Sequence, residues 1–248
     1  MPFEKIHNNE NLLITIGDSW TEGVGCYSDD LLFRYQNRKI TLDQLTHAGK
    51  TAGTFNVGSW AYQLSQDLGY DLINLGLGGT ANSWAAKTLI NESDNDYLSK
   101  YTNVLVVWLL SEPSRFSFYC QNSLASWMPA YPSVHGDTQR FLRAYFDEVK
   151  SSFEDDVKET KFYVKAVDSF CKARGYKFAY GSAFTIYPGF ENVSTNLHKH
   201  TSYKCFNDLL TNIDRRALFS PDQHPNELGY QYIGTEIAKV LRNDLKFV

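Results

Sequence analysis

The sequence lacks a long apolar run, an excess of positive charge and a cysteine pattern, and each absence excludes a class of protein. Its longest apolar run, residues 104–110, is far shorter than the roughly 20 residues that span a bilayer, so we expect no membrane span. The net charge of −4 gives no attractive field for a phosphate backbone, which argues against nucleic acid as a partner. The four cysteines stand far apart, with neither a zinc-binding spacing nor a disulfide framework, so we expect reduced thiols and no metal.

The first residues contain no basic segment followed by an apolar stretch, so no signal peptide is visible and a cytoplasmic location is expected. A chain of 248 residues is long enough for one large α/β unit, and we predict a single domain over residues 1–248. Aromatic residues make up 15% of the chain, which favours large core side chains over exposed sugar-stacking rings.

Short continuous apolar runs predict buried parallel strands, because both faces of a parallel sheet are covered. Three such runs are strong, and a fourth is weaker; they lie at residues 12–16, 71–75, 103–109 and 176–180. Apolar residues at helical spacing alternate with them and predict helices at residues 58–68, 82–90, 141–153, 157–174 and 227–245. This alternation predicts an α/β fold with an open parallel sheet of about five strands and helices on both faces.

Two excursions interrupt the alternation, near residues 26–56 and 113–140, and we interpret them as insertions in the domain. Each follows the carboxyl end of a predicted strand, directly or nearly so. Because ligands of open α/β sheets bind beyond the carboxyl ends of the strands, both insertions are placed to shape a binding site.

A serine stands where the first predicted strand ends. The strand runs directly into Gly17, Asp18 and Ser19, and a serine at a strand-to-helix turn projects its hydroxyl beyond the sheet edge. Gly17 allows the tight turn that a Cβ would obstruct. The same three residues also fit an ordinary helix cap, because Asp and Ser are common at such positions.

Two further segments supply what a serine nucleophile needs. A hydroxyl requires a base such as histidine, oriented by a carboxylate, and Asp222, His224 and Pro225 stand just before the last predicted helix. A glycine-rich run, residues 76–79, follows the second strand, where backbone N–H groups can approach an oxyanion. Each segment alone has a structural interpretation as a turn, but together they favour a catalytic site at one sheet edge.

In this order and at these strand ends, the three segments resemble the conserved blocks of the SGNH/GDSL hydrolase family, over most of the chain. The resemblance implies a flavodoxin-like three-layer α/β/α sandwich. It also implies that Ser19 is the nucleophile, that His224 is the general base, and that the backbones of Ser19 and Gly79 donate to the oxyanion. Members of the family are mostly esterases, lipases and carbohydrate deacetylases, with some acyltransferases and inactive relatives, and the resemblance implies no cofactor.

The chain departs from the family pattern at two places. Many members have the triad aspartate three residues before the histidine, where this chain has Pro221, and Asp222 is the expected orienting acid, as in relatives with the shorter spacing. After the third strand, Glu112 stands where the family usually has an oxyanion-binding asparagine in a Gly-x-Asn-Asp pattern. An ionised carboxylate accepts hydrogen bonds and cannot donate one.

Two arrangements would accommodate Glu112. In one, Glu112 points away and pairs with Arg115, while Ser111 or Asn82 supplies the missing donor. In the other, burial keeps Glu112 protonated, so that it donates as a neutral acid. We favour the first because Arg115 is close in sequence. The Glu-Pro-x-Arg pattern of this segment also resembles a bacteriophage-encoded branch of the family, for which association with a virion would be the alternative location.

Other residue groups have weaker functional interpretations. The segment 127–132 could stack on sugars, although an ordinary packed loop is favoured. The segment 198–200 contains two histidines and could bind a metal, but without further ligands a solvated loop is favoured. His135 is a rival base that fits less well than His224. Asp168 and Asp214 are interpreted as solvated helix residues.

The sequence therefore predicts a serine esterase or acyl hydrolase that uses Ser19, His224 and Asp222, with Gly79 and Asn82 at the oxyanion site. The expected partner is a small-molecule or glycan ester, for example an O-acetyl group on a carbohydrate. The alternatives are an O-acyltransferase and a binding protein that kept the fold but lost efficient catalysis. The oligomeric state, the acyl group and the alcohol do not follow from the sequence.

Overall fold

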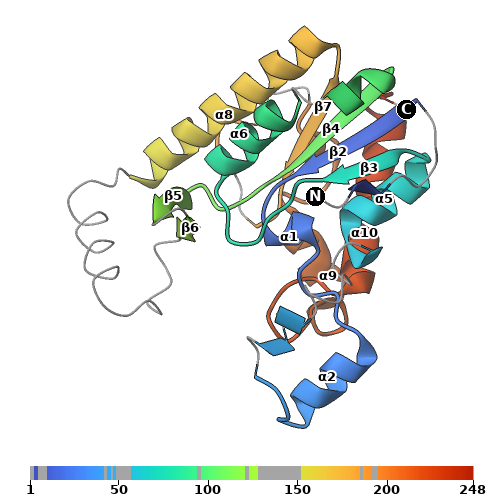
Figure 1. Cartoon of the computed structure of the whole chain (residues 1–248), viewed down its shortest axis with the longest axis vertical. Coiled ribbons are helices and arrows are strands. Elements are labelled where there is room, and N and C mark those ends of the chain that lie inside the picture. The colour runs from blue at the N-terminus through green and yellow to red at the C-terminus, as the bar shows by residue number, and fades with distance from the viewer. Residues whose placement is uncertain are drawn as a thin grey trace.

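The computed structural model describes residues 3–4, 10–41, 44–45, 47–48, 57–93, 96–120, 123–127, 152–184, 187–190 and 195–247. A five-stranded sheet in the order β1-β3-β2-β4-β7 forms its centre (Figure 1). The strands are β1 (Phe3–Glu4), β2 (Asn11–Ile16), β3 (Asp71–Asn74), β4 (Asn103–Leu110) and β7 (Lys177–Ser182). The last four are parallel, whereas β1 pairs with β3 in the antiparallel direction. The prediction of about five parallel strands is thus one too high, because antiparallel β1 occupies the edge position.

The side chains of β2 explain why its sequence does not alternate between apolar and polar residues. Leu12, Ile14 and Ile16 belong to the core on one face of the sheet, whereas Leu13 belongs to the core on the other face. All four side chains are buried. A strand covered on both faces has no position left for a polar side chain that faces water, so its sequence does not alternate.

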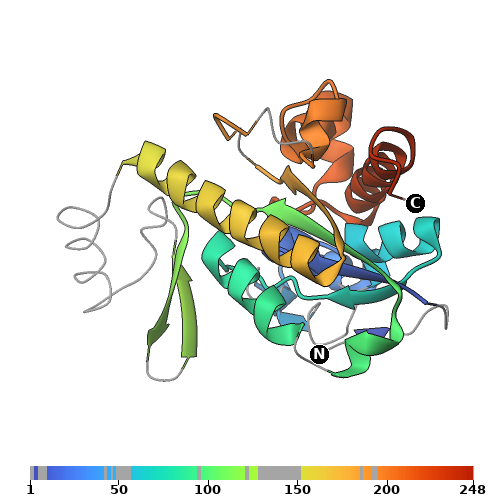
Figure 2. The ribbon, with the colours of Figure 1, turned by 90° about the horizontal axis from the view of Figure 1, so that it is seen from above.

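Helices cover both faces of the sheet, as Figure 2 shows from above. On one face lie α6 (Asn82–Glu92) and α8 (Phe153–Arg174), which share a core with β2 and β4. On the other face lie α5 (Trp60–Leu68), α9 (Phe206–Leu218) and α10 (Glu227–Asn243). The three-layer α/β/α sandwich that the sequence predicted is therefore confirmed, and it is the fold that the resemblance to the SGNH/GDSL family implied. None of the described helices is long and apolar enough to cross a membrane.

Several helix ends follow directly from the sequence. The side chains of Ser59, Ser152 and Asn226 accept hydrogen bonds from backbone N–H groups in the first turns of α5, α8 and α10. Gly69 and Gly175 end α5 and α8 in the left-handed conformation, with φ of 69° and 73°. These caps set the lengths of the helices that bring the chain back to each strand.

The strand order places a topological switch point at the carboxyl end of β2. From β2 the chain passes through α5 to β3 on one side, and then through α6 to β4 on the other side. Because α5 follows β2 and α6 follows β3, and the two helices cover opposite faces, the segments that follow β2 and β3 diverge at this point. Such a switch point is where open α/β sheets bind their ligands, so the segments after β2, β3 and β4 define the candidate site.

The two predicted insertions contain structure that the sequence did not indicate. After β2 and the short α1 (Ser19–Glu22), the first insertion contains α2 (Asp29–Gln36). The second contains a two-stranded hairpin, β5 (Phe116–Cys120) and β6 (Ser123–Trp127), which projects from the sheet in Figure 2. The helix predicted at residues 141–153 lies outside the described residues, apart from its last two positions, which belong to the start of α8.

Candidate active site

Ser19 is held in the turn between β2 and α1. Gly17 has a φ of +152°, and a Cβ built there would lie 2.2 Å from the Thr21 Oγ1, so only glycine fits this turn. Asp18 caps α1, because its Oδ1 accepts a hydrogen bond of 3.1 Å from the backbone N–H of Trp20. Ser19 is the first residue of α1 and is 9% exposed.

His224 lies next to Ser19 although the two residues are 205 positions apart. Its Nε2 is 2.9 Å from the Ser19 Oγ, which is hydrogen-bond distance. For Nε2 to accept the serine proton, the ring proton must be on Nδ1. The His224 side chain is 26% exposed, so a substrate can reach the pair from solvent.

The loop that carries His224 is anchored against the segment that follows α1. The Ser220 N–H donates a hydrogen bond of 2.8 Å to the carbonyl of His224, and the Ser220 Oγ donates one of 2.6 Å to the carbonyl of Gly25. Gly25 has a φ of +110°, and a Cβ there would lie 2.3 Å from the carbonyl oxygen of Pro225. This close approach fixes the distance between the nucleophile segment and the histidine loop.

Asp222 lies on the Nδ1 side of the His224 ring. Its Oδ2 is 3.2 Å from Nδ1, and its Oδ1 accepts a hydrogen bond of 3.2 Å from the His224 backbone N–H. The hydroxyl of Tyr27 donates a hydrogen bond to the same Oδ2. Burial raises the pKa of the Asp222 carboxyl, but the hydrogen bonds from His224 and Tyr27 and the charge of His224 outweigh burial and hold that pKa below its ordinary value. The acid is therefore ionised at neutral pH.

The glycine-rich loop after β3 lies against Ser19. A Cβ on Gly78 would lie 3.6 Å from the Ser19 Cβ, and the Gly78 N–H donates a hydrogen bond of 2.6 Å to the Glu22 Oε2 on α1. Gly79 follows with a φ of +79°. Within the part of the chain that the structure describes, the backbone N–H groups of Ser19 and Gly79 donate to no protein acceptor. Both N–H groups are therefore available for an oxyanion.

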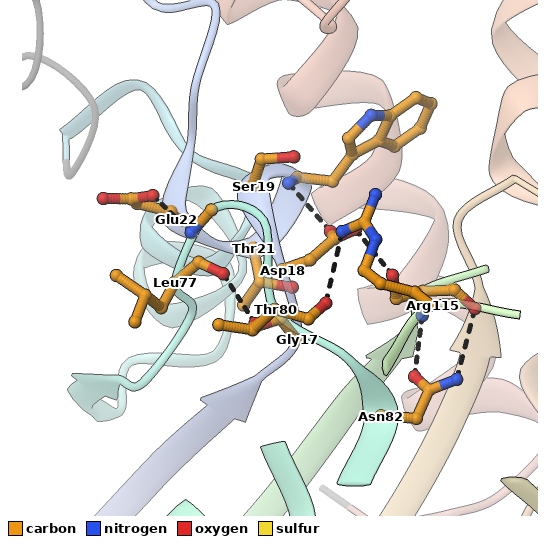
Figure 3. A network of polar contacts seen from close by, with 12 residues as sticks. Gly17, Asp18, Ser19, Thr21, Glu22, Leu77, Thr80, Asn82 and Arg115 are labelled. Atoms are coloured by element: carbon orange, nitrogen blue, oxygen red, sulfur yellow. Dashed lines mark hydrogen bonds and ion pairs between the residues drawn. The ribbon is translucent and has the colours of Figure 1, made fainter. Parts of the chain in front are cut away.

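Asn82 and Ser111 use their polar groups within the protein. The Asn82 Oδ1 accepts a hydrogen bond of 2.9 Å from the Ser111 N–H, and its Nδ2 lies 3.1 Å from the Tyr187 hydroxyl and 3.4 Å from the Thr160 Oγ1. The Ser111 Oγ donates to Asp18 Oδ2 at 3.0 Å. Figure 3 shows Asn82 on the far side of Arg115 from Ser19. These partners argue against the expected role of either side chain as a replacement oxyanion donor.

Arg115 pairs with Asp18, which corrects the expectation that Glu112 is its partner. The Arg115 Nη1 lies 2.8 Å from the Asp18 Oδ2 and donates a second hydrogen bond of 3.2 Å to the carbonyl of Thr80 (Figure 3). A turn after β4, in which the Arg115 N–H donates to the Glu112 carbonyl at 3.2 Å, brings the arginine to the sheet edge. The fully buried carboxylate of Asp18 needs a counter-charge there more than the half-buried Glu112 does.

A cavity of about 570 Å³ lies beyond the ends of β4 and β7, lined by Leu110, Ser182, His198 and other residues. Ser19 and His224 are not among its lining residues. The expectation that 198–200 is a solvated loop is wrong for His198, because this ring is buried and its Nε2 accepts a hydrogen bond of 2.7 Å from the Ser182 N–H. Burial lowers the pKa of His198 to about 4, against the opposing effects of Ser182 and Asp208.

The remaining sequence interpretations have mixed outcomes. Among the described residues, no group of three or more His, Cys, Asp or Glu side chains could hold a metal ion. His135, and the stacking segment after Trp127, lie outside the described residues. Sequence reasoning missed the contacts of Tyr27, Glu22 and Arg115. For Tyr27 no signal existed, because its partner is 195 residues away.

No protein-family model matches the chain, and no curated protein matches it. Solved structures similar to it include a protein described as lipolytic and of the G-D-S-L family from Desulfitobacterium hafniense, at 14% identity and a TM-score of 0.41, covering 94% of this chain and 100% of that one. A carbohydrate esterase family 2 enzyme from Corynascus thermopiles has 14% identity and a TM-score of 0.48, and the match covers 99% of this chain and 68% of that one. An acetyl xylan esterase from Butyrivibrio proteoclasticus has 12% identity and a TM-score of 0.43, and the match covers 100% of this chain and 66% of that one. Likeness at this level does not indicate what this chain acts on.

Proposed function

We propose that the protein is a serine hydrolase that cleaves carboxylic esters. The observation that carries the proposal is that His224 lies between the other two residues, with its Nε2 2.9 Å from the Ser19 Oγ and its Nδ1 3.2 Å from the Asp222 Oδ2. Ser19 is 205 positions from His224 in the chain, whereas Asp222 belongs to the histidine loop, and the two segments meet at the switch point of the sheet. A structural role alone would not require a partly exposed histidine to face a serine hydroxyl.

In the first half of the reaction, the Ser19 Oγ attacks the ester carbonyl carbon while its proton passes to the His224 Nε2. The electron pair of the carbonyl moves to oxygen, and the backbone N–H groups of Ser19 and Gly79 stabilise the resulting oxyanion. The intermediate then collapses, the C–O bond to the alcohol breaks, and His224 gives its proton to the leaving alcohol. Asp222 stabilises the charged imidazole that exists between these two transfers.

In the second half, water attacks the acyl group on Ser19 while His224 takes a proton from the water. Collapse of the second oxyanion breaks the bond to Ser19 Oγ, which recovers a proton from His224. The products are a carboxylic acid and the free enzyme. If a second alcohol attacks in place of water, the same steps produce a new ester, which is the transferase alternative.

For the substrate we propose an O-acetyl ester of a carbohydrate. Its support is the resemblance of the three sequence segments to a family that includes carbohydrate deacetylases. Release of acetate from an acetylated oligosaccharide, compared with release from p-nitrophenyl esters of acetate, butyrate and octanoate, tests both the acyl length and the alcohol. A preference for octanoate would contradict this part of the proposal.

Labelling with a fluorophosphonate probe, followed by peptide mapping, tests the hydrolase function directly. We expect an adduct at Ser19, its loss in Ser19→Ala, and slow labelling in His224→Ala because the hydroxyl then has no base. Thr21→Ser, which keeps a hydroxyl two residues away on α1, is a matched control that should label normally. Absence of an adduct under all conditions would instead favour a binding protein that kept the fold.

A further inference from the structure

We propose that Tyr27 is a positioning residue, which holds the Asp222 carboxylate in place for His224 through a hydrogen bond to Oδ2. This inference rests on the proposed function, because it assigns a role within the same site. The tyrosine belongs to the segment that follows the nucleophile helix, so the segment that presents Ser19 also holds the acid at the other end of the triad.

The two oxygens of the Asp222 carboxylate have different hydrogen-bond partners. Oδ1 accepts from the backbone N–H of His224, and Oδ2 accepts from the Tyr27 hydroxyl. The His224 Nδ1 lies 3.2 Å from the same Oδ2, but its direction does not satisfy hydrogen-bond geometry in this resting arrangement. The position of Asp222 is therefore set by a backbone group and a tyrosine, and the imidazole meets a carboxylate that is already oriented.

Tyr27 itself is held firmly enough to act as a reference point. The carbonyl of Val24 accepts a hydrogen bond of 2.7 Å from the buried Tyr230 hydroxyl on α10, and the carbonyl of Gly25 accepts one from Ser220. The Tyr27 ring is half-buried against the core that α5 and α10 share. The backbone just before Tyr27 and the ring of Tyr27 are thus both held by the packed part of the molecule.

The same hydrogen bond shifts the pH range over which the acid stays ionised. Tyr27 and His224 lower the pKa of Asp222 against burial, which raises it. Among the described residues, Cys26 and Tyr230 also interact with Asp222, and burial raises the pKa of both above their usual values. The charges of Glu227 on Cys26 and of Asp18 on Tyr230 raise these pKa values further. Cys26 and Tyr230 both stay neutral through the acidic and neutral range. A shift in the acidic limb of activity therefore reports on the coupled Asp222–His224 pair, together with its tyrosine.

Tyr27→Phe removes the hydroxyl and keeps the ring. We expect kcat on a short activated ester to fall about tenfold with KM within about twofold, because loss of a hydrogen bond to a charged group affects the chemical step. The acidic limb of kcat/KM should move to higher pH. Tyr62→Phe is the matched control, because Tyr62 is also half-buried against the same core and its hydroxyl has no hydrogen bond within the described residues. In an Asp222→Asn background, Tyr27→Phe should cost little more, since the two residues act as one unit.

A readout without turnover separates this inference from the proposed function. The carboxyl carbon of Asp222, followed by NMR, should titrate at higher pH in Tyr27→Phe than in the wild type or in Tyr62→Phe. An unchanged midpoint, or a kcat and pH profile that match the wild type, would overturn the role of Tyr27 even in an active enzyme. A shifted midpoint in a protein that hydrolyses no ester would support the Tyr27–Asp222 contact and reject the hydrolase function.

Discussion

Replacing Arg115 with methionine should destabilise the folded protein by about 3–5 kcal/mol, because the change leaves a buried carboxylate without its counter-charge. The Arg115 and Asp18 side chains are 8% and 0% exposed, so water cannot take over the role of the guanidinium. The Ser111 hydroxyl and the Trp20 N–H still donate to Asp18, but they are neutral. Methionine keeps most of the side-chain length, which limits the loss of packing.

Urea denaturation followed by tryptophan fluorescence measures the free energy of unfolding, and a thermal scan measures Tm. For a chain of this length, a loss of about 3–5 kcal/mol corresponds to a Tm lower by roughly 6–20 °C. Asp18→Asn combined with Arg115→Met should recover part of the loss, because the buried charge is then absent.

Lys172→Met is the matched control for Arg115→Met. It breaks the ion pair of 2.6 Å between Lys172 and Asp168 on α8, whose side chains are 73% and 23% exposed. An exposed pair of this kind contributes at most about 0.5 kcal/mol. If the free energies of unfolding of Arg115→Met and Lys172→Met lie within about 1 kcal/mol of each other, the reasoning that the buried Asp18 carboxylate depends on Arg115 for its counter-charge is refuted.

Four further outcomes are expected. Ser19→Ala and His224→Ala should each abolish hydrolysis of a short activated ester, and the double variant should be no worse; independent multiplicative losses in initial rates would contradict a shared step. Asp222→Asn should reduce the rate strongly but less than loss of Ser19 does. The pKa of Asp222 in the folded protein lies below the ordinary value of about 3.9, so its contribution to stability is present above that pH and is lost as the pH falls through the folded pKa. Asp222→Asn has no such carboxyl, so its free energy of unfolding should fall less than that of the wild type over this acidic range. Gly17→Ala should lower the free energy of unfolding, measured by urea denaturation, by about 1–3 kcal/mol, because the alanine Cβ would have no room in this turn.

The sheet and most of its helices could be predicted because their signals are local. Strands covered on both faces are continuously apolar, and α10 repeats its apolar residues at helical spacing. The hairpin of β5 and β6 was not predicted, because its two five-residue strands stand in the stretch 113–140, which was interpreted only as an insertion. The antiparallel β1 has only two residues, too few for any periodicity.

The residue types of the site were readable from the sequence, but their partners were not. Asp18 has the signature of a helix cap, and it is one, yet its second oxygen binds an arginine 97 residues away. Arg115 was assigned to Glu112 because the two are three residues apart, whereas burial decided the pairing. Which charged groups meet inside a fold depends on where the turns direct them, and sequence distance gives no measure of that.

The separation of 205 positions between Ser19 and His224 also determines when the proposed activity can arise during protein synthesis. Ser19 and the central strand leave the ribosome early, whereas the loop with His224 is made much later, just before α10, which packs on α5. A nascent or truncated chain therefore carries the serine without its base and cannot acylate it, however much of the sheet has formed. Under the proposed function, hydrolysis then requires a contact between early and late parts of the chain, so it reports the complete fold rather than a partly folded intermediate.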